Sequence, residues 1–177
     1  MESDETLYRR VREGDMAAFD ALYDRYQEQL FGFLLRMLRN RADAEDVFHD
    51  AFLSALKSTE VRFETGSFRS WLFRIARNRC KNRHRSEHRG ARALGAIEPT
   101  QAAPSAESEL QERQLLSALD GAVGRLPPAL SEIYHLRSSG LSYEEMADVL
   151  AIPLGTLKSR MNQMVSILRE EVKPWTA

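Results

Sequence analysis

Apolar residues recur at steps of three and four positions through residues 15–38, and this spacing limits the fold more than any other feature of the chain. The residues on this stripe are Phe19, Leu22, Tyr23, Tyr26, Leu30, Phe33, Leu34, Met37 and Leu38. Because an α-helix turns once every 3.6 residues, such a stripe lies along one face of a single long helix. No segment alternates apolar and polar residues as a half-buried strand does. The sequence therefore predicts an all-α fold.

Further helices and one break divide the chain into two parts. A second helix is expected to begin near Asp43, which we assign as its N-cap, and a third to follow Ser67 and run to about Ser86. Residues 87–110 lose all periodicity and fill with Ala, Pro, Ser, Glu and Gly, which is typical of a flexible linker. Four more helices are expected beyond it. The sequence thus predicts two small helical domains, residues 1–86 and 111–177, joined by a linker.

The last two expected helices form a helix-turn-helix pattern. "SYEE" predicts a capping box in which Ser142 and Glu145 satisfy each other's backbone amides at the start of one helix. The next helix runs from about Pro153 to Glu170 and carries polar and basic side chains that can pair with base edges or phosphates. These are Lys158, Ser159, Arg160, Asn162 and Gln163. An ordinary helical hairpin is the alternative interpretation.

The third helix is strongly basic. Residues 69–92 contain nine Lys or Arg and one acid, a net charge of +8, whereas the first 30 residues carry a net charge of −4. Arg74, Arg77, Lys81 and Arg85 follow one another at spacings of three, four and four, with Trp71 and Asn78 beside them. Cations beside aromatic rings suit a partly single-stranded nucleic acid, and Phe63, Phe68 and Phe73 are further candidates for base contacts. The alternative is that these phenylalanines complete the core.

Four segments together resemble the extracytoplasmic-function (ECF) group of the sigma-70 family of bacterial sigma factors. "FDALYDRYQEQLFGFLLRML", "DAEDVFHDAFLSAL" and "SFRSWLFRIARNRCKNRHR" resemble the first sigma domain in order and spacing. "LPPALSEIYHLRSSGLSYEEMADVLAIPLGTLKSRM" resembles the second. The resemblance covers roughly residues 7–86 and 111–170. It implies a protein that binds core RNA polymerase, directs it to a promoter and helps to open the DNA duplex.

The resemblance also implies three functional surfaces. The first would dock on the polymerase and comprises Asp43, Glu45, Asp46, Val47 and Asp50. The second would read and melt the −10 element and comprises Phe63, Trp71, Arg74, Arg77, Asn78, Lys81, Asn82 and Arg85. The third would read the −35 element and comprises Thr156, Lys158, Ser159, Arg160, Asn162 and Gln163. Members of the family are commonly held inactive by an anti-sigma protein, which is a further expected partner.

The chain departs from the family pattern in its second domain. Ala151 stands in the turn where the family usually has Gly, and a positive φ there would cost Ala about 1 kcal/mol. Gln163 and Val165 stand where Arg is frequent. We therefore expect fewer phosphate contacts at the −35 element and a shallower dependence of binding on salt.

Two other classes of function are weighed against this one. Cys80, His84 and His88 share a helix face with the spacing of metal ligands, but the surrounding arginines would repel a dication, so neither an enzyme nor a metal or cofactor site is expected. A free-standing helix-turn-helix regulator that binds duplex operators without polymerase is the alternative function, although it leaves the basic third helix without a role. A single cysteine, no membrane-spanning apolar run and an acidic start without a signal peptide indicate a cytoplasmic protein.

Overall fold

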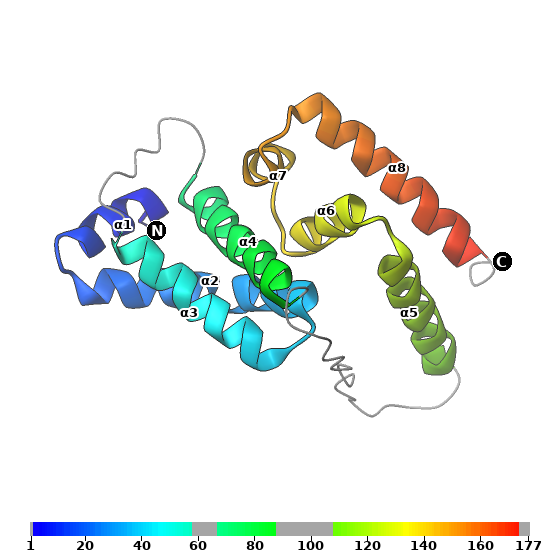
Figure 1. The fold of residues 1–177 in the computed structure, drawn as a ribbon, viewed down its shortest axis with the longest axis horizontal. Helices are drawn as coiled ribbons and strands as arrows, with labels where there is room; N and C mark the ends of the chain where they lie inside the picture. Colours follow the sequence, from blue (N-terminus) through cyan, green and yellow to red (C-terminus); the bar gives the residue numbers. More distant parts are fainter. Residues whose placement is uncertain (1, 58–66, 88–107, 174–177) are drawn as a thin grey trace.

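The structure is a computed structural model that describes residues 2–57, 67–87 and 108–173, with backbone alone for residues 56, 84–87 and 108–114. The described residues form eight helices and no strand, so the all-α prediction is confirmed. In chain order the helices are α1 (Asp4–Arg12), α2 (Met16–Leu38), α3 (Arg41–Lys57), α4 (Phe68–Glu87), α5 (Ser108–Arg125), α6 (Pro128–Ser138), α7 (Tyr143–Leu150) and α8 (Leu154–Val172). Figure 1 shows α1 to α4 gathered on one side and α5 to α8 on the other.

Polar side chains cap the helices of the first half. Asp15 accepts hydrogen bonds from the amides of Ala17 and Ala18, which fixes the start of the long helix α2. The N-cap prediction for Asp43 is wrong, because α3 begins two residues earlier and the Asp43 amide itself donates to Asn40 Oδ1 at 3.2 Å. Ser67 accepts from the Ser70 amide at 3.1 Å, as a cap of α4 should. The short helix α1, which starts after Ser3, does not stand out in the periodic pattern.

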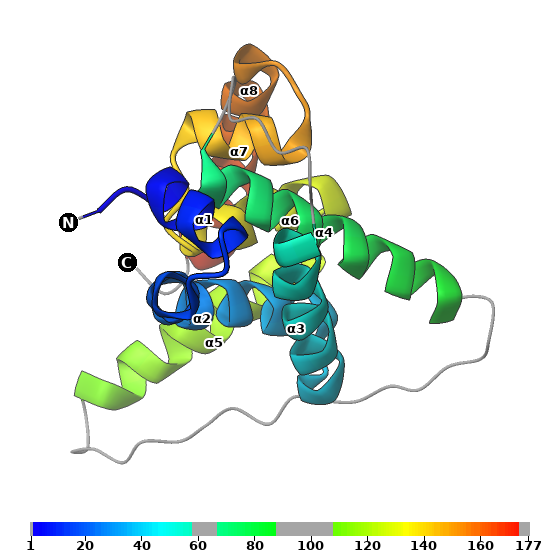
Figure 2. The same ribbon diagram turned by 90° about the vertical axis from the view of Figure 1, so that its left-hand side faces the viewer.

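Aromatic side chains hold α1 to α4 together. Phe33 on α2 meets Phe73 on α4 with 5.4 Å between ring centroids, and both are fully buried. Tyr8 on α1 lies 5.3 Å from the ring of Phe68 and donates a hydrogen bond to the Ala55 carbonyl at 2.8 Å. The first three turns of α4 therefore pack against α1, α2 and α3. Figure 2 shows α4 crossing the other helices of this half.

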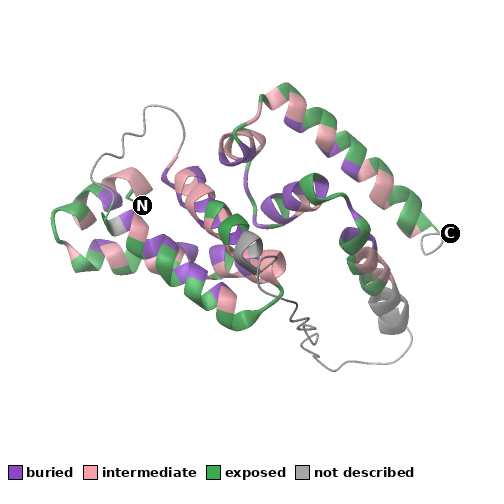
Figure 3. Ribbon diagram, in the orientation of Figure 1, coloured by how far each residue is buried: buried purple, intermediate pink, exposed green. Residues whose placement is uncertain are grey.

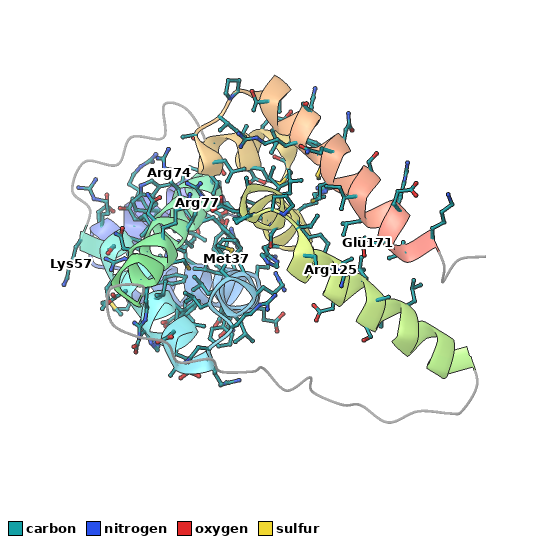
Figure 4. All side chains as sticks on the ribbon, turned by 45° about the vertical axis from the view of Figure 1, so that its right-hand side comes forward. Met37, Lys57, Arg74, Arg77, Arg125 and Glu171 are labelled. Carbon is teal, nitrogen blue, oxygen red and sulfur yellow. The ribbon has the colours of Figure 1, made fainter. Side chains whose placement is uncertain are left out.

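The second half follows the predicted helix-turn-helix pattern. Ser142 and Glu145 form the expected capping box, with bonds of 3.1 and 2.8 Å, and Leu141 and Met146 beside it are fully buried. Ala151 ends α7 in the left-handed conformation, with φ of 53°. Helices α5 and α8 lie against each other, and Arg125 at the end of α5 donates to Glu171 near the end of α8 (Figure 4).

The two halves contact each other directly. Helix α4 packs against α7, and α2 packs against α6, so that buried side chains of both halves form one continuous core. Figure 3, coloured by burial, shows buried residues in purple on both α4 and α6. Residues 88–107, most of the predicted linker, lie outside the described residues, while Glu87 and Ser108 belong to helices. Among the helices described, none has the length and apolar character needed to cross a membrane.

Candidate nucleic-acid interface

Helix α4 has one side that belongs to the core of the first half. Leu72, Phe73, Ala76 and Cys80 are all fully buried there. Phe73 therefore completes the core and is not available for base contacts, and Phe68 is also buried, against Tyr8 and Tyr26. Burial, with a smaller contribution from the negative charge of Glu132, raises the pKa of the Cys80 thiol to about 12. The thiol is thus neutral and sheltered at physiological pH.

A second side of α4 pairs with the acidic residues of α3. Arg79 contacts Asp50 at 2.9 Å, and Arg83 contacts Asp46 at 3.4 Å and also Asp43. Asp46 and Asp50 stay largely exposed, with 67% and 59% of their side-chain surface accessible, because only one carboxylate edge faces α4. Glu45 is exposed beside Arg41. The predicted docking surface is thus a solvent-facing row of carboxylates along α3.

Val47 does not belong to that row. Its side chain is 3% exposed, because it points from α3 into the core beside Ala44 and Ala51. Contact with a polymerase would require this residue to leave its packing, so the assignment of Val47 to the docking surface is wrong in this structure. Asp43 is only 16% exposed where it meets Arg83.

The third side of α4 faces the second half of the chain and carries most of the predicted cationic stripe. Arg77 donates to both carboxylate oxygens of Glu132 on α6, at 2.6 and 3.1 Å. Lys81 lies 3.8 Å from the same carboxylate, and Arg74 lies 3.3 Å from Asp148 on α7. Figure 4 shows Arg74 and Arg77 on the edge of α4 nearest the second half. Acidic side chains of the second half therefore pair with Arg74, Arg77 and Lys81, three of the four cations of the predicted stripe.

The remaining side of α4 is open to solvent. Asn78 and Asn82 are exposed there, and Trp71 is half-buried with its ring 5.4 Å from Tyr8 and 5.8 Å from Phe68. Phe63 and the side chain of Arg85 lie outside the described residues. The structure thus divides the predicted −10 residues between an open side, with Trp71, Asn78 and Asn82, and a covered side, with Arg74, Arg77 and Lys81.

Helix α8 presents the predicted −35 residues on one surface. Leu157, Met161 and Met164 are buried against α6 and α7, which turns the intervening residues outward. Lys158, Ser159, Asn162 and Gln163 are exposed, and Thr156 and Arg160 are half-buried. Pro153 precedes the helix without a side-chain cap, so its first backbone amides are available to an anion such as phosphate. All six predicted residues lie on the first half of this helix.

The acidic side chains that meet α4 were not predicted as a site. Glu132, Glu145 and Asp148 come from α6 and α7, and only Glu145 had been assigned a role, as part of the capping box. One signal was present, because Glu132 lies between the apolar residues Leu130 and Ile133 on a helix whose inner side is mostly apolar. A buried carboxylate requires a partner, but its identity cannot be read from spacing alone.

His135 is a second buried polar group near the contact between the halves. Its Nε2 lies 3.2 Å from Ser131 Oγ, and its Nδ1 has no hydrogen-bond partner among the described residues. Burial first, and then the positive charges of Arg36 and Arg39 on α2, lower the pKa of His135 to about 4. The ring is therefore neutral at physiological pH. In the described part of the chain, no group of three or more His, Cys, Asp or Glu side chains is placed to hold a metal ion.

Comparison with known proteins identifies the family of the chain. The chain matches the family model of sigma-70 region 2 over residues 22–90 and that of sigma-70 region 4 over residues 116–164. Solved structures with the same fold include CnrH in complex with the cytosolic domain of CnrY, with a TM-score of 0.70, 23% identity and coverage of 98% and 99% of the two chains. Another is the sigma factor RpoE with the anti-sigma factor NepR from Bartonella quintana, with a TM-score of 0.68, 24% identity and coverage of 88% and 96%.

Relatives by sequence extend along nearly the whole chain. The RNA polymerase sigma-H factor of Pseudomonas aeruginosa is 31% identical over 98% of this chain and 95% of its own length. The ECF RNA polymerase sigma-E factor of Haemophilus influenzae is 30% identical over 97% of this chain and 96% of its own length. Both regions are present, in the expected order, on the helices that carry the surfaces described above. The chain belongs to the ECF group of the sigma-70 family of RNA polymerase sigma factors.

Proposed function

We propose that this sigma factor binds core RNA polymerase through the carboxylates of α3 and reads two promoter elements through α4 and α8. The observation that carries the proposal is the placement of three charged or polar surfaces on three separate helices, each fixed by a buried opposite side. Asp46, Asp50 and Glu45 project from α3 toward solvent and suit a basic surface on a partner. The protein has no catalytic role of its own in this proposal, needs no cofactor, and acts in the cytoplasm with the polymerase.

For the −35 element, α8 would enter the major groove with its first half against base edges. Gln163 and Asn162 have side-chain amides that can pair bidentately with adenine. Lys158 and Arg160 can contact guanine or phosphate, and Thr156 and Ser159 lie near the free backbone amides at the helix start, where phosphate is favoured.

For the −10 element, α4 would meet separated strands. Trp71 offers part of a ring for stacking, and Asn78 and Asn82 offer amides for base edges, on the side that is already open. Arg74, Arg77, Lys81 and Arg85 would contact the phosphates, and Phe63 would add an aromatic contact from the segment before the helix. The aromatic and amide side chains would thus recognise bases, and the cations would attract the phosphate backbone.

Control by an anti-sigma protein is part of the proposal. The two structurally similar proteins named above were solved with the cytosolic domain of CnrY and with the anti-sigma factor NepR, respectively. The present chain shares their fold, so a protein partner of this kind suits it.

Reconstitution with core polymerase tests the proposal. The purified chain should comigrate with core enzyme in gel filtration, and the mixture should initiate at specific sites on fragments of a genomic library. A free-standing regulator would bind duplex DNA alone and leave the polymerase peak unchanged. Failure to join the polymerase or to change where it initiates would contradict the proposed function.

A further inference from the structure

We propose that the second half of the chain acts as a built-in blocking element, in which Glu132 and Asp148 take the place of nucleic-acid phosphates on α4 until polymerase and promoter displace them. This inference rests on the proposed function of α4 as the −10 surface. It concerns the free protein, and it assigns a role to acidic residues of α6 and α7 that promoter recognition does not use.

The Arg77–Glu132 pair is the centre of this contact. Both side chains are nearly enclosed, with 13% and 11% of their surface exposed. The two parallel hydrogen bonds use Nε and one terminal nitrogen of the guanidinium, an edge that is suited to binding a phosphate in the same forked geometry. A phosphate cannot reach this edge while Glu132 holds it. Lys81, 3.8 Å from the same carboxylate, is partly neutralised by it.

Asp148 covers the neighbouring turn of α4. It contacts Arg74 at 3.3 Å and accepts a hydrogen bond from Ser70 Oγ. At 100° per residue, Ser70, Arg74, Arg77 and Lys81 lie on one side of α4. The acids of the second half therefore follow the stripe for three turns, which a single chance surface contact would not do.

Hydrogen bonds from two further arginines to uncharged oxygens also join the two halves beside these ion pairs. Arg69 donates to the Ser139 carbonyl at 2.9 Å, and Arg36 on α2 donates to Ser139 Oγ at 2.7 Å. Gly140, with φ of 78°, forms the turn at this point, and a Cβ atom there would lie 3.3 Å from Arg69 Nη2. The turn between α6 and α7 is thus shaped to let Arg69 approach its backbone.

The surfaces left open in this arrangement suggest an order of events. Asp46 and Asp50 on α3, and Lys158, Asn162 and Gln163 on α8, remain exposed while Arg77 is covered. Polymerase can therefore be engaged first, by the closed chain, and the −10 stripe is uncovered when the halves separate on it. In the free protein, the apparent affinity for single-stranded DNA equals the affinity of the open form multiplied by the fraction of chains that are open.

A pair of variants with equal charge change tests the inference. Glu132→Gln with Asp148→Asn removes the two acids that pair with the cationic stripe of α4, while Glu144→Gln with Glu170→Gln removes two exposed acids elsewhere in the second half. Small-angle X-ray scattering of the free proteins reports separation of the halves, and fluorescence anisotropy with a labelled 20-nucleotide mixed-sequence single strand reports access to α4. We expect the first variant to expand and to bind the strand about tenfold more tightly, which corresponds to one open chain in ten in the wild type. The control should match the wild type in shape.

Equal binding by the two variants, or a wild-type chain that already scatters as two separated halves, would overturn the inference. Because Glu132→Gln leaves Arg77 without its carboxylate, a second variant keeps the test decisive if the first folds poorly. Ser70→Cys with Asp148→Cys, in a Cys80→Ala background, allows the closed form to be locked by oxidation. The locked protein should still comigrate with core polymerase, should lose strand binding and transcription, and should regain both on reduction.

Two results would count against the closed form: cysteines that do not oxidise, and an oxidised protein that binds the strand as well as the reduced one. These readouts separate the inference from the proposed function. If the chain fails to join polymerase but opens as described, the proposed function fails and the closed form stands. If the chain joins polymerase but never closes, the proposed function stands and the closed form fails.

Discussion

The guanidinium of Arg77 and the carboxylate of Glu132 form a two-bond ion pair, at 2.6 and 3.1 Å, between residues 55 positions apart in the chain. The pair is largely shielded from water, where removal of one partner typically costs about 3–5 kcal/mol because the other charge stays buried. The residue expected to grip promoter phosphates is thus also a main contact between the two halves, and variants at α4 need controls that separate these roles.

Asp46→Arg should weaken binding to core polymerase by about tenfold, or about 1.4 kcal/mol, because it reverses a charge in the middle of the exposed carboxylate row of α3. Titration of labelled chain with core enzyme measures this affinity. Glu13→Arg, at the exposed end of α1, is the matched charge reversal and should bind like the wild type. An unaltered affinity in Asp46→Arg would show that polymerase docks elsewhere.

Arg77→Ala with Lys81→Ala should reduce promoter opening by the holoenzyme about tenfold and leave its assembly intact, because two phosphate contacts at the melted strand are lost. Permanganate reactivity of thymines in the −10 element reports opening, and gel filtration reports assembly. Glu132→Gln breaks the same contact between the halves but keeps both cations of α4, so it serves as the control. Normal permanganate reactivity in the α4 variant would exclude the stripe from opening.

Gln163→Ala should alter base preference within the −35 element more than it alters overall affinity, by about 1–3 kcal/mol at one base pair. A panel of duplexes with single base-pair changes, each measured for holoenzyme binding, detects the altered position. Ser166→Ala, one turn further along the exposed side of α8, should leave the panel unchanged. A uniform loss over all duplexes would identify Gln163 as a backbone contact.

The turn at Ala151 shows what could be predicted from sequence. The capping box of Ser142 and Glu145 follows from short-range spacing and is confirmed. A left-handed residue at position 151 was suggested only by the family pattern, in which Gly usually stands in this turn, and Ala151 does adopt that conformation. Local signals were less decisive for the start of α3, where Asn40 rather than Asp43 supplies the cap, because both residues have suitable side chains within one turn. Local sequence therefore narrows the N-cap of α3 to a few candidate residues, and packing determines which of them caps the helix.

The covered side of α4 was beyond sequence reasoning. The spacing of Arg74, Arg77 and Lys81 correctly places them on one side of a helix, but it cannot show which distant residues face that side. Phe73 has the same limitation: its place in the core depends on Phe33, 40 positions earlier in the chain. Burial of Val47 was signalled by the apolar spacing of α3, and that signal outweighs its assignment to a docking surface.

Ala151→Gly should stabilise the protein by about 0.5–1 kcal/mol, because glycine adopts a φ of 53° without the steric cost that alanine bears. Urea unfolding followed by circular dichroism measures the change. Ala21→Gly, at an exposed position inside α2, is the control and should destabilise the protein by about 1 kcal/mol. Destabilisation by glycine at position 151 would show that the Ala151 methyl group makes a contact that outweighs backbone strain.

The pKa of His135 makes stability depend on pH. Its folded-state pKa of about 4 lies below the ordinary value of 6.5, so the unfolded chain binds more protons between these values. The stabilising contribution of the neutral ring is complete above pH 6.5 and is lost as the pH falls toward 4. We expect the free energy of unfolding to drop by about 2 kcal/mol between pH 7 and pH 4.5 on this account.

His135→Gln should remove that part of the pH dependence, whereas His49→Gln, on the exposed side of α3, should retain it. Urea unfolding of the three proteins at both pH values gives the comparison. Parallel losses in all three would assign the acid sensitivity to other groups.

Glu145 has a consequence for anyone who wishes to alter only one part of this protein. One of its carboxylate oxygens accepts from the Ser142 amide at the start of α7, and the other accepts from Ser67 Oγ at 3.3 Å, beside the start of α4. A change at this position disturbs the folding of the second half and its seating on the first at the same time. Residue 145 therefore serves both halves. Substitutions meant to alter only the contact between the halves are better placed at positions 132 and 148.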